Sequence, residues 1–234
     1  HSPKSSDLSF IVGPQLNSAS RIDDSSLPSK LLISNNLLEI ETIAKKLILL
    51  NEKRKLIENN VFDQALNQAK NQINQKFILV HGLDWHSGVL GIIASRLVEK
   101  FNKPSIVIST NKTISVGSAR SIKQINLGNI VLNAKKEGLL INGGGHRMAA
   151  GLKINNNMIN KFYDYLIRNF EKYDELLFQK INLYDTRLSI NEINTNLLEN
   201  IEKLEPFGNG NEEPKFIVYG ININYYKILK QKHL

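Results

Sequence analysis

The stretch Leu139-Leu140-Ile141-Asn142-Gly143-Gly144-Gly145-His146-Arg147-Met148-Ala149-Ala150-Gly151 is the one around which this chain is organised. A short apolar run, typical of a strand, leads into three consecutive glycines and then into a histidine and an arginine. Glycine reaches backbone conformations closed to other residues and leaves no Cβ between the main chain and a ligand. Consecutive N–H groups in such a loop can face one concavity and hold an anion. The pattern predicts either an ordinary tight turn or a phosphate-binding loop of Gly143, Gly144 and Gly145, with His146 at its rim.

The segments around this loop alternate between strand and helix patterns. Predicted strands are 77–80, 105–110, 114–120 and 149–154. Predicted helices are an apolar one from about 89 to 101, a second at 127–136 and a third at 158–177. Strands that alternate with helices predict an α/β or α+β domain, which we place at residues 76–178.

The flanking regions have a different character. Upstream, Asn36 followed by Glu39 resembles a capping box, and apolar residues recur behind it at helical spacing to about Gln75. This region, 28–75, is predicted to be a helix that connects two lobes. Downstream, the predicted strands are 181–190, 215–223 and 225–229, with a helix at 193–204 and a dense turn signal at 205–214.

The composition favours a polyanionic partner and excludes several kinds of site. The 234 residues include 30 Lys and Arg against 22 Asp and Glu, a net charge of +8. Such a surplus is typical of proteins that bind nucleic acid. There is no cysteine, which excludes disulfides, thiolate metal sites and cysteine nucleophiles. The apolar runs are too short to span a bilayer and the start of the sequence has no secretory h-region, so we expect a cytoplasmic protein without membrane contact.

Groups that bind phosphate recur at the ends of predicted elements. Ser118 and Arg120 end one predicted strand, His146 follows the glycines, and Arg21 lies in a segment of small residues. Arginine binds phosphate bidentately, and hydroxyl, imidazole and backbone N–H groups supply further donors. We therefore predict a phosphate site from these residues. For Arg21, a simple exposed arginine is the alternative.

The loop before the apolar helix contains the one tryptophan of the chain. Trp85 could stack on a nucleic-acid base, or it could lie in the core, as a lone tryptophan beside an apolar helix more often does. The neighbouring His86 is expected to be a structural hydrogen-bonding residue, because no carboxylate or second histidine stands at metal-ligand spacing.

Five segments, in this order, resemble the bacterial RecJ family, the single-strand-specific DNA exonucleases of the DHH phosphoesterase superfamily. The segments are 10–21, 81–92, 117–121, 143–146 and 205–211. They are similar to the family's Gly-Pro-Arg-x-Asn-Ala-Ala-Gly-Arg, Gly-x-x-Trp-His-x-Gly-Val-x-Gly-Ile, Gly-Ser-x-Arg-Ser and Gly-Gly-His motifs and to the opening of its oligonucleotide-binding (OB) domain. Gln15 and Ser20 depart from the arginine and glycine that the family usually has.

The resemblance implies a DHHA1-type mixed sheet with flanking helices, followed by an incomplete OB-like β domain. The implied domains are the end of a DHH domain at 1–27, the connecting helix at 28–75, the DHHA1-type substrate-binding domain at 76–178 and part of the OB domain at 179–234. The implied activity is Mn²⁺- or Mg²⁺-dependent hydrolysis of single-stranded DNA from its 5′ end, in DNA repair and recombination. No Asp-His-His occurs in the sequence. We therefore expect no catalytic residue and no metal ligand in this chain, and inactivity in isolation. For the missing domain three explanations stay open: a DHH domain encoded separately, a decayed gene, or a fragmentary gene model.

The resemblance also implies roles for individual residues. The expected phosphate-binding set is Arg120, Ser118, His146, Gly143, Gly144, Gly145 and Arg21, and the expected nucleic-acid contacts are Trp85, His86 and Asn17. One alternative is a non-catalytic nucleic-acid-binding module, like the similar domain of alanyl-tRNA synthetases. Another is a small-nucleotide phosphodiesterase of the same superfamily. The Trp85 segment and the turn at 206–211 favour RecJ over the first alternative, and the additional C-terminal domain argues against the second.

Overall fold

The computed structural model describes residues 5–222 and residue 225. Two compact units make up the chain, one of residues 9–180 and one of residues 1–8 with 181–234. The larger unit carries all of the predicted site residues. No helix in the described ranges is long and apolar enough to cross a membrane.

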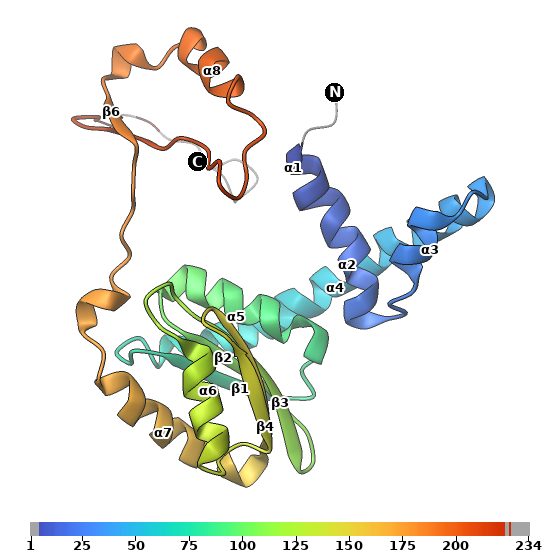
Figure 1. Ribbon diagram of the computed structural model, residues 1–234, viewed down its shortest axis with the longest axis vertical. Helices are drawn as coiled ribbons and strands as arrows, with labels where there is room; N and C mark the ends of the chain where they lie inside the picture. The colour runs from blue at the N-terminus through green and yellow to red at the C-terminus, as the bar shows by residue number, and fades with distance from the viewer. Residues whose placement is uncertain (1–4, 223–224, 226–234) are drawn as a thin grey trace. The chain divides into compact units, whose positions relative to one another are not determined.

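A five-stranded mixed sheet is the centre of the larger unit (Figure 1). The strands are β1 (Ile78–Leu83), β2 (Ser105–Thr110), β3 (Ile114–Arg120), β4 (Asn142–His146) and β5 (Ala149–Asn155). Their order across the sheet is β1-β2-β3-β5-β4. β1 runs parallel to β2, and the other neighbouring strands are antiparallel. β4 therefore forms one edge of the sheet.

Helices cover both faces of this sheet, as Figure 1 shows for α5 on one side and for α6 and α7 on the other. The helices of this unit are α2 (Gly13–Ile22), α3 (Leu27–Ile33), α4 (Leu37–Lys70), α5 (Ser87–Phe101), α6 (Leu127–Lys136) and α7 (Ile159–Glu171). Ile106 and Ile108 of β2 pack with α6 and α7, whereas Val107 between them packs with α4 and α5. A strand buried on both faces explains why its central residues 106–108 are apolar without alternation.

Helix α4 begins at its predicted cap. The Asn36 side chain accepts hydrogen bonds from the backbone N–H groups of Leu38 and Glu39. The helix ends at Lys70, several residues before the predicted end. Leu47 in its first half packs with α2 and α3, and Val61 in its second half packs with α5. One long helix thus positions both α2 and α5.

The three glycines form a strand, so the prediction of a loop at 143–145 is wrong. They lie in β4, where Gly144 pairs with Gly151 of β5. The apolar run before them is not the strand, since β4 begins at Asn142 and Leu140 is buried in the core. The low strand propensity of glycine indicated a turn, but pairing with β5 and close packing by α6 decide the conformation.

The smaller unit contains short elements. They are β6 (Thr186–Leu188), α8 (Thr195–Glu202) and β7 (Phe216–Val218), with β6 parallel to β7. Each is shorter than predicted. The predicted turn is confirmed: Gly208 and Asn211 form two backbone hydrogen bonds, at 2.8 and 3.1 Å. Of the predicted strand 225–229, residues 226–229 lie outside the described residues.

Short helical turns make up the remaining helical elements of the described residues. They are α1 (Ser5–Asp7), the π-helix η1 (Leu8–Val12), and the 3₁₀ turns η2 (Asn156–Met158), η3 (Glu175–Phe178) and η4 (Ile190–Glu192). None of them contributes a residue to the predicted site.

Candidate nucleic-acid interface

Two arginines that are distant in sequence meet beside the N-terminal end of α5. Arg21, in the last turn of α2, donates from Nη1 to the backbone oxygen of Gly88 at 3.0 Å. Arg120, the last residue of β3, donates from Nη1 to the backbone oxygen of Ala119 at 2.9 Å and to Ser118 Oγ at 3.3 Å. Within the described residues, neither guanidinium has a carboxylate at ion-pair distance. Two such groups without a nearby acid have the chemistry to bind an anion.

The electrostatic environment of Arg120 also favours a bound anion. Burial lowers the pKa of its guanidinium, and the positive charge of Arg21 lowers that pKa further. Arginine stays protonated in proteins, so the shift reflects a charge held in unfavourable surroundings. An anion bound between the two side chains would relieve both causes.

Two glycines of α5 make room for these arginines. A methyl group at Gly88 would lie 2.1 Å from the backbone oxygen of Arg21. At Gly91 it would lie 2.9 Å from Arg120 Nη2 and 3.2 Å from Ser118 Oγ. Neither glycine was predicted from the sequence to belong to the site. The available signal was the motif at 81–92, which contains both glycines. Because α5 begins at Ser87, before the predicted start at about 89, both lie on this helix, and their separation of three residues places them on one face.

His86 and Trp85 lie at the start of α5 but differ in exposure. His86 is the N-cap of α5, where its Nδ1 accepts a hydrogen bond from the Gly88 N–H at 3.2 Å. Its exposed ring keeps Nε2 for an outside partner. Trp85 is only 5% exposed, and its Nε1 donates to Gln64 Oε1 at 3.0 Å. Stacking of a base on Trp85 is therefore not available, because its ring is enclosed by α4 and by the backbone at Gly82.

Asn17 lies one helical turn before Arg21 on α2 and is exposed. Residues four apart share a helix face, so its amide is on the same side as the guanidinium. Ser20, which replaces the glycine of the family motif, donates a hydrogen bond from Oγ to the backbone oxygen of Asn17. The hydroxyl of Ser20 is thus satisfied within its own helix.

The register of the sheet places His146 in line with Arg120. Arg120 pairs with Ala149 of β5, and Ala149 pairs with His146 of β4. Directly opposed residues of antiparallel strands project from the same face, which in this sheet is the face that α5 covers. Two inter-strand spacings put the Cα atoms of Arg120 and His146 about 10 Å apart. The two side chains can therefore approach one small anion from opposite sides.

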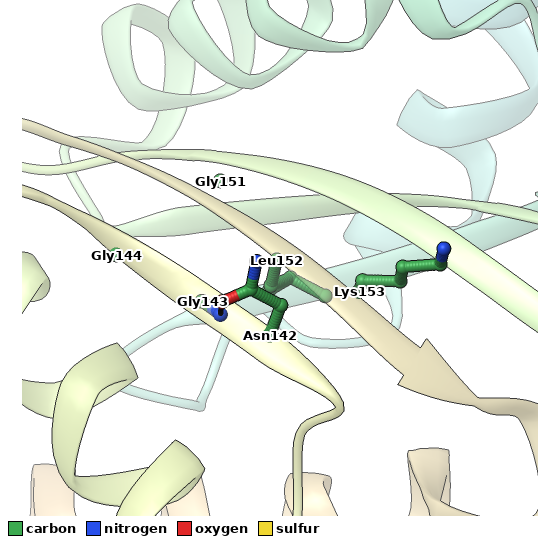
Figure 2. A pocket seen from close by; sticks show the side chains of 6 residues that line it. All are labelled: Asn142, Gly143, Gly144, Gly151, Leu152 and Lys153. Atoms are coloured by element: carbon green, nitrogen blue, oxygen red, sulfur yellow. Dashed lines mark hydrogen bonds between the residues drawn. The ribbon is translucent and has the colours of Figure 1, made fainter.

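Over β4 and β5 this face carries a hollow of about 390 Å³. Its lining residues are Asn142, Gly143, Gly144, Gly151, Leu152 and Lys153. Figure 2 shows Asn142 and Lys153 toward one end, with Gly144 and Gly151 further along the two strands. The hollow thus continues the sheet face on which Arg120 and His146 project.

The charged residues between positions 100 and 163 are almost all positive. Residues 100–163, which include β2 to β5, contain ten Lys and Arg but a single acid, Glu137. That excess of nine exceeds the net charge of +8 of the entire chain. Such an excess of positive charge favours a polyanion over a small neutral ligand. Over the described ranges, no three side chains of His, Cys, Asp or Glu are grouped as ligands for a metal ion.

Comparisons with known proteins match both parts of the chain. Residues 73–172 match the family model of the DHHA1 domain, and residues 184–234 match that of the RecJ OB domain. The chain is 33% identical over 221 residues to the single-stranded-DNA-specific exonuclease RecJ of Haemophilus influenzae, and 32% identical over 239 residues to that of Escherichia coli. These alignments cover 91% and 97% of this chain but 38% and 40% of the relatives. The chain thus spans about two-fifths of their length.

Solved structures show the same fold. RecJ from Thermus thermophilus in complex with Mn²⁺ matches with a TM-score of 0.82 at 25% identity, over 93% of this chain and 32% of that one. A structure of exonuclease RecJ bound to manganese matches with a TM-score of 0.67 at 25% identity, over 76% of this chain and 44% of that one. The mixed α/β architecture predicted from the sequence is confirmed.

Proposed function

Because this chain belongs to the RecJ family, we propose that it is the substrate-binding part of a RecJ-like 5′–3′ single-stranded-DNA exonuclease. The observation that carries the proposal is the Arg21–Arg120 pair beside Ser118, two cations held together with no acid of residues 5–222 at ion-pair distance. Relatives named as single-stranded-DNA-specific exonucleases support it, and so does the positive charge of residues 100–163.

We propose a division of labour along the chain. Residues 76–178 form the substrate-binding domain, and residues 179–234 belong to an OB domain. Residues 28–75 form the connection between the substrate-binding domain and residues 1–27, which are the end of a DHH domain. The succession of the two domain matches, at 73–172 and 184–234, supports this division.

In this proposal, the terminal 5′ phosphate of a single strand lies between Arg21 and Arg120. Arg120 offers a planar fork of donors, and the hydroxyl of Ser118 lies within hydrogen-bond distance of it. His146 reaches the same phosphate from β4. Gly143, Gly144 and Gly145 form a strand rather than an anion-binding loop, so in this proposal they do not cradle the terminal phosphate.

Hydrolysis of the bound strand needs metal ions in addition to the phosphate-binding residues. The Thermus thermophilus RecJ structures are in complex with Mn²⁺ or Mg²⁺, ions that activate water and clamp phosphoryl oxygens. The described residues of this chain do not fit such an ion, because no three suitable ligands come together among them. We assign them no step of the hydrolysis and place the metal ligands in the part of the relatives that this chain does not span.

We therefore propose that residues 1–234 alone bind DNA without cleaving it, and that a DHH domain supplies the metals. The purified chain is incubated with 5′-labelled single strands and Mn²⁺, beside a full-length RecJ as positive control. We expect mononucleotides from the control only. Robust metal-dependent release by the chain itself would overturn this part of the proposal.

Binding is tested with two oligonucleotides that differ only in a 5′ phosphate or a 5′ hydroxyl. We expect the chain to prefer the phosphate, and Arg120→Ala to weaken that binding about 10- to 100-fold, as for a lost charge-assisted contact of about 1.5–3 kcal/mol. Arg120→Ala with His146→Ala should lose less than the two separate losses combined, because residues that share one ligand couple.

The control variant is Lys161→Ala, which removes a charge from α7 on the opposite side of the sheet. It should bind both oligonucleotides like the unmodified chain. An Arg120→Ala variant that lost affinity equally for both oligonucleotides, or lost none, would contradict the proposed phosphate site.

We place the activity in DNA repair and recombination, in the cytoplasm. The support is family membership together with the nucleic-acid-binding character of the chain. Cells that lack the gene should be more sensitive to DNA damage, and normal survival after ultraviolet irradiation would argue against this role.

A further inference from the structure

Two glycines of β4 are required by the fold itself. A methyl group at Gly143 would lie 2.8 Å from Val131 Cγ1 of α6. Gly145 has φ of +156°, and a methyl group there would lie 2.2 Å from the backbone oxygen of Ala149. Close packing and backbone conformation thus account for glycine at these positions.

Two other glycines have no such internal reason. Gly144 and Gly151 are directly paired across β4 and β5. A methyl group at Gly144 would meet nothing within 4 Å, and at Gly151 only the backbone oxygen of Gly117 at 4.0 Å. Neither has a φ in the left-handed region. Glycine weakens a strand interior and often marks close approach of a ligand. Gly144 and Gly151 therefore leave the backbone of β4 and β5 accessible to a ligand.

Basic side chains stand at one end of this bare surface. Lys153 pairs with Asn142 across the two strands, and both line the hollow (Figure 2). Asn142 Oδ1 accepts hydrogen bonds from Lys135 Nζ and from the Gly143 N–H, each at 2.9 Å. The Lys135 ammonium group therefore contacts Asn142, whereas the Lys153 side chain extends away from it (Figure 2). In the described part of the chain, neither lysine forms an ion pair.

The hollow lies on the same sheet face as the proposed phosphate site but at a distance from it. Arg120 pairs with Ala149, and Lys153 follows four residues further along β5, about 13 Å away. A mononucleotide bound at Arg120 has a single phosphate and does not reach Lys153. A longer single strand carries further phosphates in that direction.

We propose that the hollow over Gly144 and Gly151 is a second subsite, which holds an internal sugar–phosphate segment of single-stranded DNA. The segment lies against the bare strands, and Lys153, with Lys135 beside Asn142, neutralises its phosphate. Charge complementarity and continuity with the site at Arg120 select this occupant. The inference rests on the proposed function, because the bound strand is the one whose 5′ end Arg120 holds.

Two variants test the subsite. Gly151→Val fills the hollow with a residue favoured in strands, and Lys153→Ala removes its cation. Each is titrated with thymidine 5′-monophosphate, followed by NMR, and with a 5′-phosphorylated ten-nucleotide strand. We expect Gly151→Val to weaken binding of the ten-nucleotide strand at least tenfold and Lys153→Ala several-fold. Neither should change mononucleotide binding. Thermal melting checks that both variants fold, and Lys161→Ala is the charge-matched control.

Arg120→Ala, measured in parallel, separates the two proposals. It should weaken binding of both ligands. If it does so while Gly151→Val and Lys153→Ala bind the long strand normally, the subsite is wrong and the proposed function stands. If Arg120→Ala binds both ligands normally, the proposed function fails and the subsite with it. Equal losses for both ligands in Gly151→Val would also overturn the subsite, because they would indicate general damage.

Discussion

Gly88 and Gly91 stand three residues apart on α5, and a methyl group would meet a different kind of neighbour at each. At Gly88 the neighbour is the backbone oxygen of Arg21, which α2 holds in place. At Gly91 the nearest neighbour is the end of the Arg120 side chain, which can turn away. At the scale of the residue, the first glycine serves the fold and the second serves the site.

The same substitution should therefore separate stability from binding. We expect Gly88→Ala to lower the free energy of unfolding by about 1–3 kcal/mol through overpacking. Gly91→Ala should leave stability unchanged or raise it, because alanine is favoured over glycine in a helix by up to about 1 kcal/mol. It should nevertheless weaken binding of a 5′-phosphorylated strand. Urea denaturation and fluorescence titration measure the two effects. A Gly91→Ala variant with unchanged affinity would contradict the proposed role of Gly91.

Gln68 in the last turn of α4 and Gln72 just beyond its end take the place of a neighbouring strand at the edge of the sheet. Gln72 Nε2 donates to the backbone oxygen of Leu79 at 2.7 Å, and the Leu79 N–H donates to Gln72 Oε1 at 2.9 Å. Gln68 forms the same pair of bonds with His81, at 2.8 and 3.1 Å. Two side-chain amides thus satisfy edge groups of β1 that would otherwise pair with another chain.

Removal of either amide should lower the free energy of unfolding, and most of all where the strand residue that it contacts is buried. Leu79 is buried and His81 is exposed. We expect Gln72→Ala to lower the free energy of unfolding by about 1–3 kcal/mol, because it leaves a buried donor and acceptor without partners. Gln68→Ala should cost less, since water reaches His81. Amide hydrogen exchange at Leu79 should accelerate in Gln72→Ala. Equal effects of the two substitutions would speak against this explanation.

A charged network fixes α4 against α5. Glu58 accepts from Arg54 of its own helix and from Arg96 of α5, the latter at 3.0 Å. The Arg96 guanidinium also lies 3.7 Å from the centre of the Phe62 ring. The side chains of Glu58 and Arg54 are only 13% and 11% exposed, so their ion pair is largely removed from water.

Glu58→Ala should therefore lower the free energy of unfolding by about 3 kcal/mol, because the guanidinium groups of Arg54 and Arg96 lose the carboxylate that they share. The matched control is Glu41→Ala, which removes an acid from an exposed pair with Lys45 and should cost less than about 0.5 kcal/mol. Chemical denaturation measures both. Similar costs for the two variants would show that the network at Glu58 does not hold the helices together.

At the scale of the whole molecule, charge is concentrated in one part of the sequence. Residues 100–163 carry ten cations and one acid, while the chain as a whole carries 30 and 22. Phosphate contacts release counterions from a nucleic acid, so affinity depends on salt. The cations of β3 and β5 should dominate that dependence.

We expect the affinity for a single strand to fall linearly on logarithmic axes as salt rises, with a slope of about −0.7 for each phosphate neutralised. Arg120→Ala and Lys153→Ala should each make the slope shallower by about 0.7, and Lys161→Ala should leave it unchanged. Affinity that stays flat between low and moderate salt would argue against a contact dominated by phosphates.

The sequence alone determined the features that depend on residues close to one another in the chain, namely the bounds of several strands and helices and one helix cap. The predicted strands 105–110 and 114–120 and the helix 127–136 have the bounds found for β2, β3 and α6. The cap at Asn36 was predicted correctly as well. Apolar periodicity and capping act within a few residues, so they can be read without knowledge of the fold. The order of the family motifs was equally accessible, because it is a property of the sequence.

Only the tertiary structure decided which residues meet and which remain open. Arg21 and Arg120 are nearly a hundred positions apart, yet α5 packs against both of their elements and brings them together. Pairing with β5 made a strand of Gly143–Gly145, and packing against α4 enclosed Trp85. The open space beside Gly144, where a methyl group would meet nothing within 4 Å, likewise depends on the packing of the surrounding elements. Register, burial and the proximity of charges are set by contacts between distant segments, and local sequence patterns carry no information about them.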